Sequence, residues 1–473
     1  LPMVKIGGGT LSLTAENAYT GGTMVREGTV QLGVANALPT GSVLTLGQGG
    51  ASGMLRLNGF NQQLAGLLIE GTAGTANRVV NGSSTAATIT LDIAAGQTGT
   101  FAGMFGGNAS NENNLSVVKQ GEGTFRLGAA STHTGGTTVR EGTLSLGIAN
   151  ALPTSSTVTL GGDGTSGTFA LNGYSQQLGR LAIAGTAGAD NRVINGGSTA
   201  ATLTLSIGSE QTQTFGGTLG GPGANENNFS LLKSGAGTLV LSAANTYTGG
   251  TTIRAGTVQL GRANALPAGS AVTLGYDDTS SANADTSGTL ALNGFDQQVS
   301  GIRVVRATGA ANRVINGSAT PATLTFDTAA GDYTRFAGTL GGTTDTDSNF
   351  GLTKQGAGML QLTQPGRYTG DTVVAAGTLQ LGLAAGMDGA KLWLDANSGN
   401  VITNESGGVT QWLDQSGNGR NATAAGATNA VATTNTLVNR MGVVRFNGTD
   451  QHFGVDLSFL ANSGYTILAV EGR

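Results

Sequence analysis

The fold is decided by a stretch near the middle of the chain that reads Gly237-Thr-Leu-Val-Leu-Ser-Ala-Ala-Asn-Thr-Tyr-Thr-Gly-Gly-Thr-Thr-Ile-Arg-Ala-Gly-Thr-Val-Gln-Leu-Gly261. Leu239 and Leu241 lie two residues apart near its start, and Val258 and Leu260 repeat that spacing near its end. Side chains two residues apart point to the same face of a strand. Each pair therefore predicts a short strand with one buried face, and the polar residues and paired glycines between them predict a turn.

This stretch returns along the chain in step. Its Tyr-Thr-Gly-Gly-Thr core recurs with one or two substitutions, and a lysine follows the same spacing of 114, 114 and 121 residues. The core begins at Tyr19, His133, Tyr247 and Tyr368, and the lysines are Lys5, Lys119, Lys233 and Lys354. The seven extra residues of the third copy fall in the polar segment 276–285, which predicts a loop that bulges from one turn.

Short strands at intervals of 19 to 25 residues, separated by glycine, predict a parallel β-solenoid whose coils stack on one another. We expect about five coils of roughly 23 residues in each 114-residue unit. At the ~4.8 Å spacing of neighbouring strands, residues 1–385 would give about 17 coils and a rod on the order of 80 Å long. Glycine supplies the backbone conformations with positive φ that tight corners need.

The composition agrees with a scaffold. The chain has 473 residues, of which 82 are glycine, and only 11 % are charged. A formal charge of −4 argues against nucleic-acid binding, which needs a clustered basic surface. Cysteine is absent, which excludes disulfides and thiolate chemistry. The sequence contains no apolar run of the ~18 residues that a membrane-spanning helix needs.

The repeated stretch resembles the autotransporter-associated β-strand repeat, also called the passenger-associated transport repeat. The resemblance covers about residues 9–33, 123–147, 237–261 and 358–382. It implies a right-handed parallel β-helix in a secreted or surface-displayed bacterial protein, commonly a large adhesin, and it supplies no catalytic residues. Because Leu1 aligns with Leu115 in the middle of a repeat, we expect the chain to be a segment of a longer protein.

The pattern changes near Gly386, where the repeat stops and both tryptophans, Trp393 and Trp412, occur within twenty residues. The segments 391–396, 409–422 and 443–453 resemble the opening strands of a concanavalin A-like, laminin G-like jelly roll. We therefore expect two domains, a β-solenoid over residues 1–385 and a partial β-sandwich over residues 386–473. The fold class is all-β.

The second domain holds the candidate ligand-binding residues. An oxygen-rich turn follows Trp412, and we single out Trp412, Asp414, Asn418 and Asn421. Such a turn could hold calcium or the edge of a sugar, and the tryptophan could stack on a sugar ring. An ordinary Asn-Gly turn and a packed core tryptophan are the alternatives. No other metal or cofactor is indicated.

Catalytic groups are few. His133 stands where other copies have tyrosine, which indicates a structural ring, and His452 falls in a predicted strand. The acidic cluster of Asp277, Asp278 and Asp285 lies only in the inserted loop, where a solvated turn is the simpler interpretation.

These patterns favour a non-enzymatic extracellular protein in which the solenoid displays a lectin-like domain for adhesion or matrix attachment. Its partners would be glycans or surface and matrix proteins. A structural subunit that self-associates into a filament or sheath is the alternative, and a carbohydrate-active β-helix enzyme ranks third, because it would need clustered acids and bases.

Overall fold

The computed structural model describes residues 1–275, 286–305 and 311–382, together with residues 394, 401–403, 408–413, 421–424, 431–432 and 453–454. The inserted segment 276–285 with its three aspartates lies outside these residues. Contacts divide the chain into two compact units, Leu1–Gln380 and Leu381–Arg473. Each unit is described by itself.

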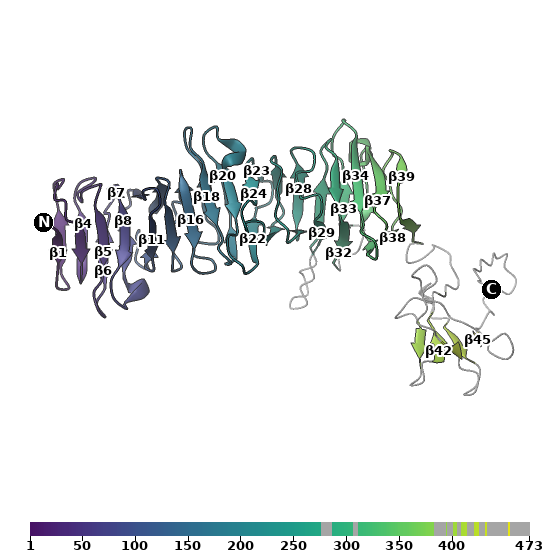
Figure 1. Ribbon diagram of the computed structural model, residues 1–473, viewed down its shortest axis with the longest axis horizontal. Coiled ribbons are helices and arrows are strands. Elements are labelled where there is room, and N and C mark those ends of the chain that lie inside the picture. Colours follow the sequence, from purple (N-terminus) through teal and green to yellow (C-terminus); the bar gives the residue numbers. More distant parts are fainter. Residues whose placement is uncertain are drawn as a thin grey trace. The chain divides into compact units, whose positions relative to one another are not determined.

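The first unit is a parallel β-solenoid, in which strands from successive turns lie side by side (Figure 1). Its strands form three continuous faces. The first face contains β1 (Met3–Lys5), β3 (Thr23–Val25), β5 (Val43–Leu46), β8 (Gly66–Ile69), β11 (Thr98–Phe101), β14 (Thr124–Leu127), β16 (Gly142–Leu146), β18 (Gly167–Ala170), β21 (Arg192–Ile194), β24 (Thr218–Leu219), β31 (Gln297–Val299), β34 (Ala322–Asp327), β37 (Phe350–Gln355) and β39 (Thr372–Val374).

The second face contains β2 (Thr10–Leu13), β4 (Gly28–Leu32), β6 (Gly53–Arg56), β9 (Arg78–Val80), β12 (Met104–Phe105), β19 (Gln176–Leu178), β22 (Ala201–Ser206), β25 (Phe229–Ser234), β27 (Thr251–Ile253), β29 (Ala271–Leu274), β32 (Gly301–Val304), β35 (Tyr333–Phe336), β38 (Met359–Leu362) and β40 (Thr378–Leu381). The third face contains β7 (Gln62–Leu64), β10 (Ala87–Asp92), β13 (Leu115–Gln120), β15 (Thr137–Val139), β17 (Thr157–Leu160), β20 (Arg180–Ile183), β23 (Thr212–Phe215), β26 (Thr238–Leu241), β28 (Gly256–Leu260), β30 (Gly288–Ala291), β33 (Arg313–Ile315) and β36 (Thr339–Leu340).

Where a face lacks a strand, an irregular segment fills its place. On the first face, segments 243–247 and 263–267 bridge β24 and β31. The N–H of Thr246 donates to the carbonyl of Leu219 over 2.9 Å. The Asn245 amide donates to the carbonyl of Ala265 over 2.7 Å, and the N–H of Leu266 donates to Gln297 over 3.0 Å. Segments 129–133 and 149–153 do the same on the second face one repeat earlier.

The number of turns in a repeat follows from this arrangement. From β13 to the equivalent strand β25, the chain passes through twelve strands and two irregular segments, each occupying the next face in order. Fourteen segments on three faces make four and two-thirds turns, so 114 residues give about 24 residues per turn. The expected five turns of about 23 residues were therefore one third of a turn too many. Equivalent strands move to a different face at each repeat: β1 is on the first, β13 on the third, β25 on the second and β37 on the first again.

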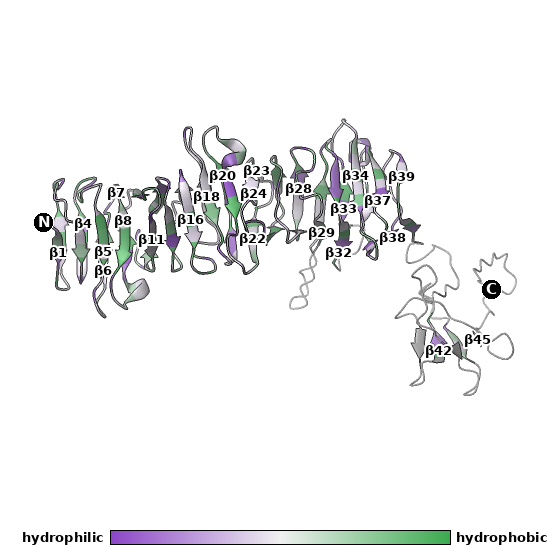
Figure 2. Ribbon diagram, in the orientation of Figure 1, coloured by the Kyte–Doolittle hydropathy of each residue, from purple (hydrophilic) through white to green (hydrophobic). Residues whose placement is uncertain are grey.

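The core runs through the middle of the solenoid. Inward positions on all three faces hold fully buried Leu, Val, Ile and Phe, and these side chains form one continuous cluster from Val25 to Leu362. Hydrophobic and hydrophilic residues are mixed along the strands (Figure 2), as expected when successive side chains point in and out. This alternation confirms the strand pattern predicted from the paired apolar residues.

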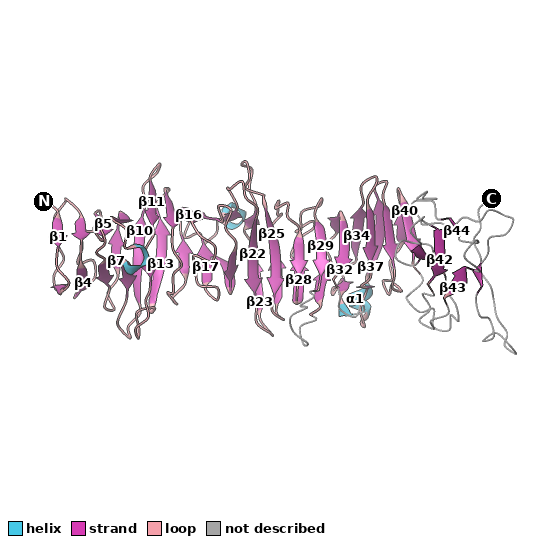
Figure 3. Cartoon of the chain, turned by 90° about the horizontal axis from the view of Figure 1, so that it is seen from below, coloured by secondary structure: helices cyan, strands magenta, loops and turns pink. Residues whose placement is uncertain are grey.

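Glycine and asparagine shape the corners. Asn36, Asn150 and Asn264 occupy one repeat position, and each has φ +49°, a left-handed conformation that asparagine tolerates better than most residues. At Gly167 the reason for glycine is close approach, since an added Cβ would lie 1.9 Å from the carbonyl oxygen of Val139 on the preceding turn. Short helical pieces occur at other corners (Figure 3): η1 (Gly74–Ala76), η2 (Gly188–Asp190) and α1 (Asp345–Ser348).

The second unit contains an antiparallel sheet in the order β41-β42-β43-β45, with β44 paired to β42. Its strands are β41 (Val401–Thr403), β42 (Gly408–Trp412), β43 (Ala422–Ala424), β44 (Val431–Ala432) and β45 (Phe453–Gly454). The change from parallel to antiparallel pairing accompanies the change in sequence pattern near residue 386. The jelly roll itself stays a prediction.

Candidate binding surfaces

The ligand-binding residues expected in the second unit fall partly within its sheet. Trp412 ends β42, is half-buried, and pairs across the sheet with Ala422. Asn421, also half-buried, directly precedes that partner, so Trp412 and Asn421 lie at adjacent strand ends. Asp414 and Asn418 lie outside the described residues, as does His452. A sugar or calcium site built from these four residues therefore stays a prediction.

His133 lies in the solenoid core. Its side chain is fully buried, packs edge-on against Phe105 with ring centroids 6.3 Å apart, and places Nε2 2.9 Å from the hydroxyl of Thr137. Tyr247, its equivalent, makes the same contact with Thr251 over 2.5 Å. Burial lowers the pKa of His133 to about 4. The ring is therefore neutral at pH 7, and its place in the core matches that of tyrosine.

The repeated lysines are also buried, which the sequence pattern had not indicated. Lys119, Lys233 and Lys354 have no exposed surface. Lys119 Nζ donates to the carbonyls of Gln120, Gly121 and Glu141 over 2.8, 2.5 and 3.1 Å. The third carbonyl belongs to the next turn, so the ammonium group ties two turns together. Burial lowers the pKa of Lys119 to about 8, against an opposing effect of Asp92 and Glu141.

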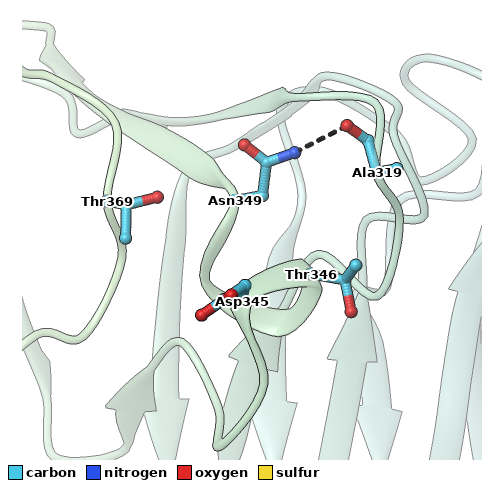
Figure 4. A pocket seen from close by; sticks show the side chains of 5 residues that line it. All are labelled: Ala319, Asp345, Thr346, Asn349 and Thr369. Atoms are coloured by element: carbon cyan, nitrogen blue, oxygen red, sulfur yellow. Dashed lines mark hydrogen bonds between the residues drawn. The ribbon is translucent and has the colours of Figure 1, made fainter.

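A shallow depression of about 300 Å³ lies at the corner beside α1. Ala319, Asp345, Thr346, Asn349 and Thr369 line it (Figure 4). The Asn349 amide donates to the carbonyl of Ala319 over 2.9 Å and fixes two adjacent turns. Asn228 bonds in the same way to the carbonyl of Ser198 over 3.0 Å. The sequence analysis missed this corner, although the recurrence of Asn114, Asn228 and Asn349 was a signal that could have found it.

The chemistry of these surfaces is that of hydrogen bonding. Within the described ranges, no three His, Asp or Glu side chains come together in a way that could hold a metal ion. No helix in the same ranges has the length and apolar character needed to cross a bilayer.

Comparison with known proteins bears on the repeats. The passenger-associated transport repeat family matches residues 3–32, 117–146, 231–260 and 352–381. The chain is 35 % identical over 141 residues to the adhesin BmaC autotransporter of Brucella suis biovar 1 (strain 1330). That match covers 30 % of this chain and 4 % of the Brucella protein. No solved structure matches the chain. The chain thus carries four passenger-associated transport repeats and is homologous to part of an autotransporter adhesin.

Proposed function

We propose that the chain is a non-enzymatic segment of a bacterial surface adhesin, located outside the cell or on its surface. The observation that carries this proposal is the coincidence of four passenger-associated transport repeats with a continuous parallel β-solenoid. The similarity to an adhesin autotransporter supports the same role. In this proposal the solenoid, residues 1–385, is a right-handed stalk.

The stalk would display residues 386–473, a concanavalin A-like or laminin G-like domain that attaches to glycans or to surface and matrix proteins. The antiparallel pairing of β41 to β45 and the adjacent placement of Trp412 and Asn421 support a separate binding module. Indole rings stack on sugar faces and amides bond to hydroxyl groups, so these two residues suit a glycan edge. Calcium at Asp414 and Asn418 would complete such a site.

A glycan array probed with the full chain tests this display. We expect retention on at least one class of glycan and a loss of about tenfold or more in Trp412→Ala. Gln177→Ala, at an exposed position on β19, is the control and should bind as the unaltered chain does. Retention on no glycan would remove the lectin-like role. Failure of beads coated with the chain to attach to host cells or matrix would contradict adhesion itself.

A filament or sheath subunit is the second candidate, and exposed apolar side chains at the solenoid's outermost strands favour it. Val4 on β1 is 44 % exposed, and Val373 and Val374 on β39 are 49 % and 50 % exposed. Strand edges that carry such residues can pair with other chains. Electron microscopy of the full chain at increasing concentration distinguishes the two candidates, because a filament subunit would lengthen whereas a displayed stalk would stay as single particles.

A further inference from the structure

Each long repeat builds one corner lobe from two loops on adjacent turns. The first lobe consists of residues 47–52 and 70–77, and the second of residues 161–166 and 184–191. An asparagine side chain holds each lobe to the strand that follows its first loop. Asn77 Oδ1 accepts from the N–H of Gly53 over 2.8 Å, and Asn191 Oδ1 accepts from the N–H of Gly167 over 2.9 Å.

The third repeat has the same framework in its described part. Asn312 Oδ1 accepts from the N–H of Gly288 over 2.8 Å. In all three repeats, a Cβ added to the bonded glycine would collide with a carbonyl of the preceding turn, at 2.0 Å for Gly53 and 2.1 Å for Gly288. The lobes are therefore three copies of one rigid corner.

These three corners lie on three different edges of the solenoid. The first loop of each lobe joins β5 to β6, β17 to β18 and β29 to β30. By face, these connections run from first to second, from third to first, and from second to third. The fractional turn count, four and two-thirds per repeat, is the cause.

We propose that the solenoid presents its repeat-encoded surface on all sides, with each corner lobe turned by about 120° from the one before it. The rise between consecutive lobes is about 22 Å, from four and two-thirds turns at ~4.8 Å each. Partners that recognise consecutive lobes approach from different sides and do not compete for one face. Three repeats, or fourteen turns, bring the pattern back to its starting edge.

The decisive pairing is between β17 and β20. The slip of one third of a turn places β20 on β17, with Thr159 aligned to Ala182, whereas Gln177 of the intervening strand β19 aligns with Thr204. In a repeat of whole two-stranded turns, β19 would lie on β17 instead. Because the chain has no cysteine, pairs of introduced cysteines report these contacts without background.

Oxidation of Thr159→Cys/Ala182→Cys should give an intramolecular disulfide, since aligned residues on neighbouring strands fall within the Cα range that a disulfide spans. Thr138→Cys/Thr159→Cys is paired in either arrangement and is the positive control. Thr159→Cys/Gln177→Cys should stay reduced. Cross-linking of this last pair in preference to the first would overturn the proposal.

Spin labels on the lobes measure the rotation directly. Thr75 and Ala189 are exposed, equivalent positions on the first and second lobes. Thr98 and Thr218 lie five strands apart in one column of the first face, which gives a reference separation of about 24 Å along the stack alone. Pulsed electron paramagnetic resonance on Thr75→Cys/Ala189→Cys should give a distance longer than that of Thr98→Cys/Thr218→Cys, although its rise is smaller. A lobe-to-lobe distance equal to or below the reference would place both lobes on one edge and contradict the proposal.

Discussion

At the scale of single residues, His133 makes one repeat sensitive to acid. Its pKa of about 4 in the fold lies below the ~6.5 of a free histidine, so the unfolded chain binds more protons between these values. The stabilisation is present above pH 6.5 and is lost as the pH falls toward 4. At pH 5 the loss amounts to about 2 kcal/mol.

Replacing this residue with the tyrosine of the neighbouring repeats should remove the sensitivity. In His133→Tyr, we expect amide hydrogen exchange in β15 to be as slow at pH 5 as at pH 7, after correction for the intrinsic rate. The unaltered chain should lose protection there at pH 5. Strand β27 beside Tyr247 is the internal control. Equal protection of β15 at both pH values in the unaltered chain would contradict the expected titration.

Lys119 offers a test with the opposite chemistry. In Lys119→Met, the carbonyls of Gly121 and Glu141 lose a buried donor, which should cost about 1–3 kcal/mol in local stability. Denaturant-dependent hydrogen exchange of β13 and β15 measures the cost. Arg140→Met, an exposed neighbour, should be close to neutral.

The pH dependence of this lysine has a definite sign. Its pKa in the fold, about 8, lies below the usual 10.5, so the unfolded chain holds more protons between these values. Stability of this corner should therefore rise as the pH increases from 8 to 10.5 in the unaltered chain. Lys119→Met should lack that rise. A similar rise in both proteins would assign it to another group.

The sequence predicted the repeat position of such residues better than their environment. The alignment of His133 with Tyr247 was visible in the sequence, and the structure gives both rings the same threonine contact. The burial of Lys119 was not predictable, because a lysine before glycines usually indicates an exposed turn. Its partners are backbone carbonyls of two turns, and backbone groups leave no mark on the amino-acid pattern.

At the scale of elements, glycine at the start of the strand following each first lobe loop locks two turns together. Gly167→Ala should destabilise the second repeat by about 3 kcal/mol or more, because the new Cβ would meet the carbonyl oxygen of Val139 at 1.9 Å and force strands β15 and β18 apart. The melting temperature and limited proteolysis between residues 139 and 167 measure the effect. Gly50→Ala is the matched control, since that corner is open. Equal stability of the two variants would contradict the packing described here.

Strands were predictable and the segments between them were not. Apolar pairs such as Leu239 and Leu241 indicated most strands, because alternation survives in any well-packed sheet. Segment 243–247 fills a strand's place with side-chain amides instead of a ladder, so it carries no strand signal. Counting strands alone therefore gave five turns per repeat and hid the extra third.

At the scale of the solenoid, the repeat should behave as a removable unit. Deleting residues 115–228 joins Asn114 to Phe229, which occupies the place of Leu115, and leaves every turn with a neighbour of the same kind. Since repeat proteins are stabilised mainly by neighbour contacts, the shortened chain should fold with an unchanged β-sheet circular dichroism signal per residue. Electron microscopy should show a solenoid shorter by about 22 Å. An unfolded product would indicate interactions between distant repeats.

The backbone hydrogen bonds that join the turns run along the length of the stack, which determines how the stalk responds to tension. A pull on its two ends loads these bonds in series, so turns detach one at a time from the weaker end. Each detached turn of about 24 residues exchanges ~4.8 Å of stack for roughly 80 Å of extended chain. A tether built in this way lengthens stepwise and dissipates energy at each step, and the buried lysines that clamp neighbouring turns set where the steps pause.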